Sequence, residues 1–422
     1  MTDVIVLGAG LAGLRCAARL EELGREVVVL EAADEPGGRQ RTDRLDGYLC
    51  DRGFAVINPA YPELGNAVDL DALDLRPFRA GALVRTQDRG LVALADPRRQ
   101  PALLVKTLTS GLLDPRELAT LARWVAPALG PVDRLLQRRD TTLRESLDAA
   151  GVHGPLRESV LEPFLSGVLV ESYGETSAVF TQLLVRMFVL GTPGLPSRGI
   201  DTLPRLMAAW LRGPLHTGRR VEAVEAGAAA GVRVRAAGET HEARAVVVAT
   251  DAPDAGELLG QRPAGSELRE MHGLSTWWFG TDTPPHELAM LAVDGRRAGG
   301  RLPGPVWNCA DVTAAAPTYA PAGRRLIQAT TLHDRPEIPA EEDDVRRHLS
   351  QIYGCDTATW EVITRHDIPR ALPAIPPPLQ TRLPQRVRDG VYVCGDHRDT
   401  ASIQGALVSG RRAAEAVHAD LR

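Results

Sequence analysis

Short apolar runs and one helix-like repeat fill the first thirty residues. Residues 4–7 are all apolar and end at Gly8, which is typical of a strand buried in a parallel sheet. Residues 11–23 place apolar side chains at helical spacing, Gly24 follows as a helix stop, and residues 26–30 form a second β-branched run. The pattern predicts a strand, a helix and a second strand, which together form one βαβ unit.

The pattern changes twice in the middle of the chain. From residue 108 to about 150, helical segments with polar breaks predict a helical insertion, in which Asp114 caps a helix that begins at Pro115. Strand patterns return between residues 221 and 250. Further strand-like and Pro/Gly-rich stretches between residues 274 and 321 predict a second lobe that contains a sheet.

The C-terminal region repeats the pattern of the N-terminal one. Residues 390–394 form an apolar strand that ends at Gly395 and Asp396, and from about Ser402 onward the chain is expected to be helical. We therefore expect both ends of the chain to belong to one domain.

The composition is that of a globular protein with more than one domain. Its 422 residues suggest two to four lobes at roughly 100 to 200 residues per domain. The net charge of -5 arises from interspersed charges, so we expect no nucleic-acid partner. Five scattered cysteines fit reduced thiols in a cytoplasmic protein. No apolar run approaches the ~18 residues of a spanning helix, so any membrane contact should be peripheral.

Motifs for metal-dependent or serine hydrolase chemistry are missing. His241 and His286 are each followed by a glutamate but lack a second histidine at the spacing of a zinc helix. No G-x-S-x-G segment occurs, and only one G-x-G-x-x-G is present. We expect no bound metal and no separate nicotinamide site.

The glycine-rich turn after the first strand carries the clearest chemistry. A first glycine permits the tight turn, a second lets a pyrophosphate approach, and a third allows close packing of the helix, whose N-terminus attracts negative charge. Glu31, at the end of the second strand, is placed to accept hydrogen bonds from ribose hydroxyls. The turn predicts dinucleotide binding through Gly8, Ala9, Gly10, Leu11, Ala12 and Gly13.

A second polar segment follows Glu31 directly. Ala32, Gly38 and Arg39 lie just past the acid, and the planar guanidinium of Arg39 suits a second phosphate contact. The glycine-rich turn, Glu31 and the G-G-R segment that ends at Arg39 together resemble the N-terminal motifs of one superfamily. It comprises flavin amine oxidases, phytoene desaturases and protoporphyrinogen oxidases. The resemblance continues through residues 51–54 and 196–204, and it implies FAD as the cofactor, with Val221 in a strand near the adenine.

The C-terminal strand and helix resemble the second flavin segment of that superfamily. Asp396 at the strand end is suited to a ribityl hydroxyl or a phosphate-bound water. Ile403 and Gln404 would lie at the helix N-terminus, where backbone amides stabilise negative charge on a reduced flavin. Read without the N-terminal motifs, the same segment is equally consistent with a helix that packs closely through small residues.

We therefore predict an α/β protein with a Rossmann-like FAD-binding domain. A second, substrate-binding domain should combine a mixed or antiparallel sheet with the helical insertion. The FAD-binding domain is expected from residues 1–75, 192–256 and 366–422, and the substrate-binding domain from 76–191 and 257–365.

The near absence of lysine among the basic residues limits which reaction we expect. Forty-eight of the 49 are arginine, and Lys106 is the only lysine. Amine oxidases of the superfamily usually hold a water near the flavin with a lysine, but here the corresponding segment contains Arg370, which cannot act as a neutral base. Arg370 could bind an acidic substrate group or brace its loop. His397 is a candidate proton relay, or a histidine hydrogen-bonded to its loop.

These features favour hydride removal from a C–H bond over amine oxidation. Residues 402–406 also resemble a segment of plant-type desaturases. We predict dehydrogenation of an apolar, isoprenoid or polycyclic molecule, with oxygen or a quinone-like compound as electron acceptor. The alternatives are an amine oxidase with an atypical site and a flavin-retaining protein without net turnover.

Two apolar groups allow more than one interpretation. Residues 277–279 could line an apolar pocket, but sheet packing is the simpler explanation. The leucine-rich segment around residues 103–124 could form an apolar entrance, rest on a membrane, or be a buried helix pair.

Overall fold

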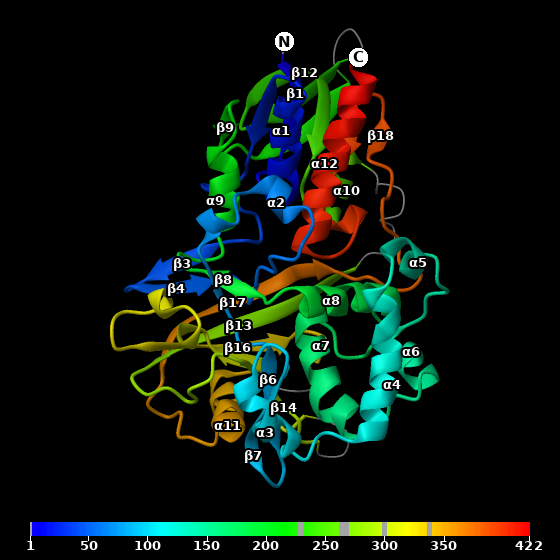
Figure 1. Cartoon of the computed structure of the whole chain (residues 1–422). Coiled ribbons are helices and arrows are strands. Elements are labelled where there is room, and N and C mark those ends of the chain that lie inside the picture. Colours follow the sequence, from blue (N-terminus) through cyan, green and yellow to red (C-terminus); the bar gives the residue numbers. More distant parts are fainter. Residues whose placement is uncertain (1, 227–230, 261–269, 298–301, 336–339) are drawn as a thin grey trace.

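The computed structural model in Figure 1 describes residues 2–226, 231–260, 270–297, 302–335 and 340–422. Two large sheets lie in different lobes of an elongated molecule. The lobe that holds the first sheet also holds both chain termini, and the second sheet and the helical insertion form the other lobe. The α/β class expected from the sequence is confirmed, and strands from both chain ends lie in the first sheet.

The sheet of the first lobe has a parallel centre. β1 pairs with β2 and β12, and β19 continues the parallel order beyond β12. Residues 245–248 of β12 are fully buried because both neighbouring strands and helices on the two faces cover them. The eight strands are β1 (Thr2–Leu7), β2 (Val27–Leu30), β9 (Leu215–His216), β10 (Val221–Ala226), β11 (Val232–Ala236), β12 (Glu239–Val248), β18 (Arg386–Arg388) and β19 (Val391–Val393).

Helices from the two chain ends pack together on this sheet. α1 (Leu11–Glu22) buries Leu14, Cys16 and Leu20, as its helical spacing predicts. It lies against α12 (Ile403–Asp420) so closely that a Cβ on Gly410 would be 2.2 Å from the carbonyl oxygen of Ala12. The remaining helices of this lobe are α2 (Leu64–Ala67), α9 (Thr202–Ala209) and α10 (Ala252–Leu259).

The second sheet is mixed, with one parallel pair between β14 and β6. Trp277 and Phe279 point to one face of β13 and Trp278 to the other, and all three are buried in sheet packing. α11 (Glu342–Tyr353) covers one face. The strands, in spatial order, are β17 (Glu361–Pro373), β13 (Met271–Thr281), β16 (Arg325–Leu332), β15 (Val306–Asp311), β14 (Leu291–Asp294), β6 (Gly81–Thr86) and β7 (Gly90–Ala95).

The helical insertion is longer than the sequence pattern indicated. It continues to residue 190 because α7 and α8 are largely apolar and buried on more than one side, which hides the helical period. The predicted cap is confirmed: Asp114 accepts hydrogen bonds from the amides of Arg116 and Glu117. The helices are α3 (Leu104–Leu108), α4 (Pro115–Val125), α5 (Val132–Leu136), α6 (Leu143–Ala149), a π-turn (Arg157–Leu161), α7 (Glu162–Leu169) and α8 (Ala178–Leu190).

Two short strand pairs complete the described chain between the large sheets. They are the hairpin of β3 (Thr42–Leu45) with β4 (Tyr48–Asp51), and β5 (Leu75–Pro77) with β8 (Gly194–Pro196). β17 crosses the expected boundary at residues 365 and 366, and the domain boundaries themselves remain a prediction. No helix among the described residues is long and apolar enough to cross a bilayer.

Candidate active site

A cavity of about 1160 Å³ extends from the glycine turn of the first lobe to the helical insertion of the second. Its wall in the first lobe comes from the β1–α1 turn, the end of β2, the start of β10 and the β19–α12 connection. Among the residues predicted to bind the cofactor, Ala9, Gly13 and Gln404 are not part of the wall. The wall contains Gly8, Gly10, Leu11, Ala12, Glu31, Ala32, Gly38, Arg39, Val221, Asp396 and Ile403.

The three glycines of the turn have different surroundings. Gly8 adopts φ +104°, and a Cβ on Gly13 would lie 2.0 Å from the carbonyl oxygen of Gly8, so both are needed for the turn itself. A Cβ on Gly10 would meet no atom within 4 Å, because this residue faces the cavity. α1 begins here without a side-chain cap or an acidic residue in its first turn. Its N-terminus is thus free to hold an anionic group.

Glu31 is held at the end of β2 by backbone donors. The amides of Ala9 and Ala33 donate to its two carboxylate oxygens at 2.6 and 2.8 Å. These bonds explain the position of Ala9, whose amide orients the carboxylate while its own side chain is buried. Glu31 and Val221 line the same end of the cavity, as expected for residues near the ribose and the adenine.

Arg39 and Asp396 join the two chain ends across the cavity wall. The guanidinium donates to the Asp396 carboxylate at 2.7 Å and to the carbonyl of Ala371 at 2.8 Å. Burial alone would raise the pKa of Asp396, but the guanidinium of Arg39 outweighs it and lowers that pKa below its ordinary value. Asp396 is therefore a buried, ionised hydrogen-bond acceptor beside the cavity.

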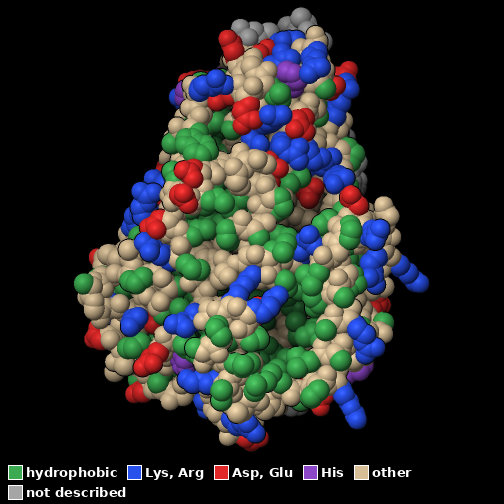
Figure 2. Space-filling view, viewed as in Figure 1, with side chains coloured by type: hydrophobic (Ala, Val, Ile, Leu, Met, Phe, Trp, Pro, Cys, Tyr) green, Lys and Arg blue, Asp and Glu red, His purple; other side chains and the backbone are tan. Residues whose placement is uncertain are grey.

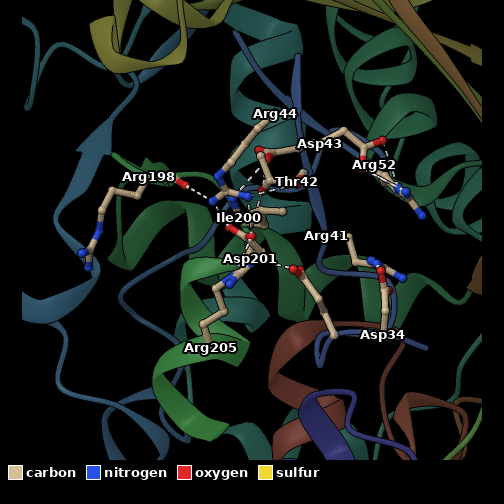
Figure 3. Close-up of polar contacts among 12 residues, drawn as sticks. Asp34, Arg41, Thr42, Asp43, Arg44, Arg52, Arg198, Ile200, Asp201 and Arg205 are labelled. Atoms are coloured by element: carbon tan, nitrogen blue, oxygen red, sulfur yellow. Dashed lines mark hydrogen bonds and ion pairs between the residues drawn. The ribbon is translucent and has the colours of Figure 1, made fainter. Parts of the chain in front are cut away.

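The loop that carries Arg39 is anchored to α9 and to the β3–β4 hairpin. Arg41 pairs with Asp34 at 2.8 Å and Arg44 pairs with Asp201 at 2.9 Å. Figure 3 shows these residues side by side. Arg205 of α9 bridges Asp201 and Glu35. These ion pairs fix both ends of the segment that contains the G-G-R motif.

Asp51 is a fully buried carboxyl beneath this loop. It accepts hydrogen bonds from the Thr42 hydroxyl, the Ile200 amide and the Tyr319 hydroxyl, and so it links the hairpin to both lobes. Burial raises its pKa to about 7 despite these donors. The contacts join the segments 51–54 and 196–204, in which the sequence resembled the superfamily.

The start of α12 is capped by its own sequence. Ser402 accepts a hydrogen bond from the amide of Gly405 at 3.0 Å, and Ile403 lines the cavity. The side chain of Gln404 instead turns away and accepts from the amide of Glu63 at 2.9 Å. Contact between Gln404 and the cofactor therefore remains a prediction.

Neither candidate catalytic side chain is free to act on a substrate in this arrangement. Arg370 lines the cavity, but its guanidinium pairs with Asp254 at 2.7 Å and Asp251 at 3.3 Å, which fits the bracing interpretation. The hydrogen bond to Asp254 and the charge of Asp251 raise its pKa further. His397 is buried against Gly395 and does not line the cavity. Their catalytic roles remain predictions.

The half of the cavity in the second lobe is apolar, and sequence analysis did not identify it. None of the wall residues contributed by 160–193 carries a charge. Phe164 and Phe188 stack edge to face with ring centroids 5.5 Å apart, and Phe54 and Phe78 do so at 6.0 Å. Burial raises the pKa of Tyr61, another wall residue, to about 12. These aromatics come from separate segments, so no local pattern could have grouped them.

Charged residues also line the cavity near its apolar half. Arg79, Asp96, Arg98 and Arg99 line the cavity between β6 and the insertion. Asp96 is neutralised by a two-pronged ion pair with Arg98, at 2.7 to 3.2 Å. Arg99 donates to backbone carbonyls at the end of α8, including that of Phe188 at 3.1 Å. The only lysine, Lys106, is exposed on α3 and does not line the cavity.

The part of the cavity that the first lobe lines fits an FAD molecule. The uncapped start of α1 and the open space at Gly10 suit a pyrophosphate, and Glu31 and Asp396 suit ribose and ribityl hydroxyls. Among the described residues, no group of three or more His, Cys, Asp or Glu is arranged to hold a metal ion. Fold and site together define a two-lobed, nucleotide-binding oxidoreductase.

The chain belongs to the family of flavin-containing amine oxidoreductases, whose model matches residues 11–418. A flavin cofactor is a feature of this family, in agreement with the FAD that the glycine turn and the G-G-R segment predicted.

Relatives within the family differ in activity. The chain is 28% identical to a flavin-dependent L-tryptophan oxidase of Lentzea aerocolonigenes over 53% of this chain and 52% of the relative. It is 33% identical to protoporphyrinogen oxidase 2 of Arabidopsis thaliana over 26% of this chain and 21% of the relative. A putrescine oxidase bound to putrescine has a similar structure, with a TM-score of 0.71 at 18% identity over 99% of both chains. Matches to individual curated relatives cover only part of their length, from 6% for a possible histone demethylase of Drosophila melanogaster to 52% for the tryptophan oxidase.

Proposed function

We propose that this enzyme dehydrogenates an apolar, isoprenoid or polycyclic molecule and passes the electrons to oxygen or a quinone-like acceptor. We place it in the cytoplasm. The observation that carries the proposal is the uncharged wall of residues 160–193, which would exclude water and solvate an apolar substrate. Bound FAD would supply the hydride acceptor, and the second hydrogen would leave as a proton that water at the open end of the cavity takes up.

The protein residues act in this proposal by positioning and by excluding water. The carbonyl of Ala371 and the carboxylate of Asp396 fix Arg39, and Asp396 would hold the cofactor from the C-terminal side. The aromatic pairs around Phe54 and Phe188 would hold a flat or elongated apolar substrate. No protein base is required, which agrees with the involvement of Arg370 in ion pairs.

Amine oxidation is the second candidate, because a tryptophan oxidase and a putrescine oxidase are among the similar proteins. A cationic amine would be best held by an unpaired carboxylate. Asp96 is the acid that lines the cavity beside the insertion, and its charge is neutralised by Arg98. The chain also has no lysine at the cavity. Both observations favour the apolar substrate.

The decisive test is anaerobic reduction of the FAD-loaded enzyme. We expect cyclic alkenes or polyenes, or a small molecule that copurifies and is identified by mass spectrometry, to bleach the flavin absorbance, and primary amines to leave it unchanged. Bleaching by amines alone would overturn the proposal. Leu184→Asp places a charge in the apolar wall and should slow bleaching by about tenfold or more. Leu118→Asp, an exposed position on α4 outside the cavity, should not slow it.

A further inference from the structure

A buried amide interrupts the apolar half of the cavity. Asn308, on β15, is 3% exposed and forms part of the cavity wall. Its Oδ1 has no hydrogen-bond partner among the described residues, and none of them accepts a hydrogen bond from its Nδ2. A buried polar group in a folded protein is normally paired with protein, water or a ligand. An amide that the protein leaves unpaired beside a cavity is therefore suited to a ligand that the cavity binds.

The neighbouring helix makes room for this amide. A Cβ on Gly167 of α7 would lie 2.0 Å from Nδ2 of Asn308, so a larger residue at that position would displace the side chain. A glycine inside a helix costs stability relative to alanine. Asn308 also pairs in the sheet with Thr330 of β16, whose side chain lies on the same face and lines the cavity too. Helix and sheet thus hold the amide in the wall from two sides.

A second asparagine in the wall shows the opposite arrangement. Asn58 is 2% exposed, its Nδ2 donates to the carbonyl of Met187 at 2.9 Å, and its Oδ1 accepts from the amide of Ala60 at 3.0 Å. Asn58 therefore holds its own loop against α8. Because the amide of Asn308 makes no such contacts with the described chain, folding does not explain its place in the wall.

The surroundings of Asn308 favour an uncharged partner. Gly167 and Thr330 carry no charge, and neither do the wall residues contributed by 160–193. An ionised group beside a neutral amide would lack a counter-charge here, which makes its transfer from water costly. A hydroxyl is neutral and can donate to Oδ1 or accept from Nδ2. Figure 2 shows a hollow in this lobe with apolar side chains along its lower and right edges, so the rest of the molecule should be apolar.

We propose that Asn308 selects substrates that carry a hydroxyl group on an otherwise apolar skeleton. This inference rests on the proposed function and narrows its substrate class. β17 reaches the FAD part of the cavity through Ala371, whose carbonyl accepts from Arg39, and two strands separate β17 from β15. At about 4.8 Å per strand, the amide lies roughly 14 Å across the sheet from β17. Asn308 would thus hold the hydroxyl end of the substrate, while the carbon that is oxidised lies toward the FAD.

The test compares two probes that differ by one hydroxyl. α-Terpineol and p-menth-1-ene share a carbon skeleton, and anaerobic isothermal titration calorimetry measures the affinity of each for the FAD-loaded full chain. We expect the wild type to bind the alcohol about tenfold or more tightly than the hydrocarbon, because the hydrocarbon leaves the amide unpaired. Asn308→Ala should abolish this preference. Equal affinities in the wild type, failure of the wild type to bind either probe, or a preference that persists in Asn308→Ala would each overturn the proposal.

Asn58→Ala is the matched control, because it removes a paired amide from the same wall. It should keep the preference for the alcohol and lower the melting temperature, since the carbonyl of Met187 and the amide of Ala60 lose their partner. Asn308→Ala breaks no hydrogen bond within the described chain, so its melting temperature should fall by less. A larger fall in Asn308→Ala, with the preference unchanged, would assign Asn308 to packing.

The selection by Asn308 and the proposed reaction can fail separately. Bleaching of the flavin by amines alone would overturn the reaction, and it is measured by turnover of the bound FAD. The preference for α-terpineol over p-menth-1-ene is measured by binding without turnover. Its absence, or its persistence in Asn308→Ala, would overturn the role of Asn308 whether or not alkenes reduce the flavin.

Discussion

Gly10 separates cofactor binding from folding at the scale of one residue. A Cβ there meets no protein atom within 4 Å and points into the cavity. We expect Gly10→Val to abolish FAD retention, because its side chain would occupy the space of the pyrophosphate. The melting temperature of the cofactor-free protein should change little. Flavin absorbance per protein and a thermal melt measure the two effects.

Two other glycines serve as references for this prediction. Gly65 also has open space around it but lies in α2 outside the cavity, so Gly65→Val should retain FAD. Gly13→Val should lose both FAD and stability, since its Cβ would clash with the carbonyl of Gly8. Full flavin occupancy in Gly10→Val would show that the phosphates bind elsewhere.

Asp51 should make stability depend on pH. Its pKa is raised from 3.8 to about 7 by burial, so its contribution is most favourable below about pH 4 and is lost as the pH rises through about 7. Asp51→Asn resembles the protonated form. We expect the variant to gain stability relative to the wild type between pH 5 and pH 8, by about 2 to 3 kcal/mol. Urea unfolding at both pH values measures this difference.

Asp34→Asn is the control for that experiment. Asp34 is exposed, and its hydrogen bond to Arg41 lowers its pKa, so it stays ionised between pH 5 and pH 8. Its effect on stability should be the same at both pH values. If Asp51→Asn also behaves in this way, the Asp51 carboxyl is ionised in the folded protein throughout that range.

At the scale of elements, Glu63 holds α1 and α12 together. Its carboxylate pairs with Arg15 of α1 at 3.2 Å and Arg411 of α12 at 3.0 Å, and Glu63 and Arg15 are both buried. Glu63→Ala would leave Arg15 with Glu22 as its remaining partner. We expect a loss of about 3 kcal/mol in the free energy of unfolding, measured by urea titration. Glu415→Ala, which breaks a more exposed pair with Arg411, should cost less than about 1 kcal/mol.

Local patterns were sufficient for short buried strands that end at a glycine or an acid and for helices with one buried face. The β1–α1–β2 unit, the cap of α4 at Asp114 and the closing helix α12 have the expected positions. α8 was not identified, because the cavity on one side and the insertion on the other remove its polar face. α3 lay in a leucine-rich segment for which several interpretations were open, since the orientation of its leucines depends on tertiary packing.

At the scale of the molecule, the sequence specified the cofactor half of the cavity better than the substrate half. Most residues predicted to contact FAD belong to short sequence motifs at a strand end or a helix start, as the glycine turn and Glu31 show. The apolar half depends on Phe54, Phe164 and Phe188, which three separate segments bring together. Their roles follow from the packing of the two lobes and not from any local spacing.

One cofactor site built from both chain ends should couple FAD binding to the stability of the whole first lobe. The β1–α1 turn, the start of β10 and the β19–α12 connection all line the same cavity, so bound FAD holds three distant segments in place. At about 100 times its Kd, FAD should stabilise the folded state by about 2.7 kcal/mol, which raises the melting temperature by several degrees. Differential scanning fluorimetry with and without added FAD measures the rise, which Gly10→Val should abolish and Gly65→Val should retain. An equal rise in Gly10→Val would mean that FAD stabilises the protein from outside this cavity.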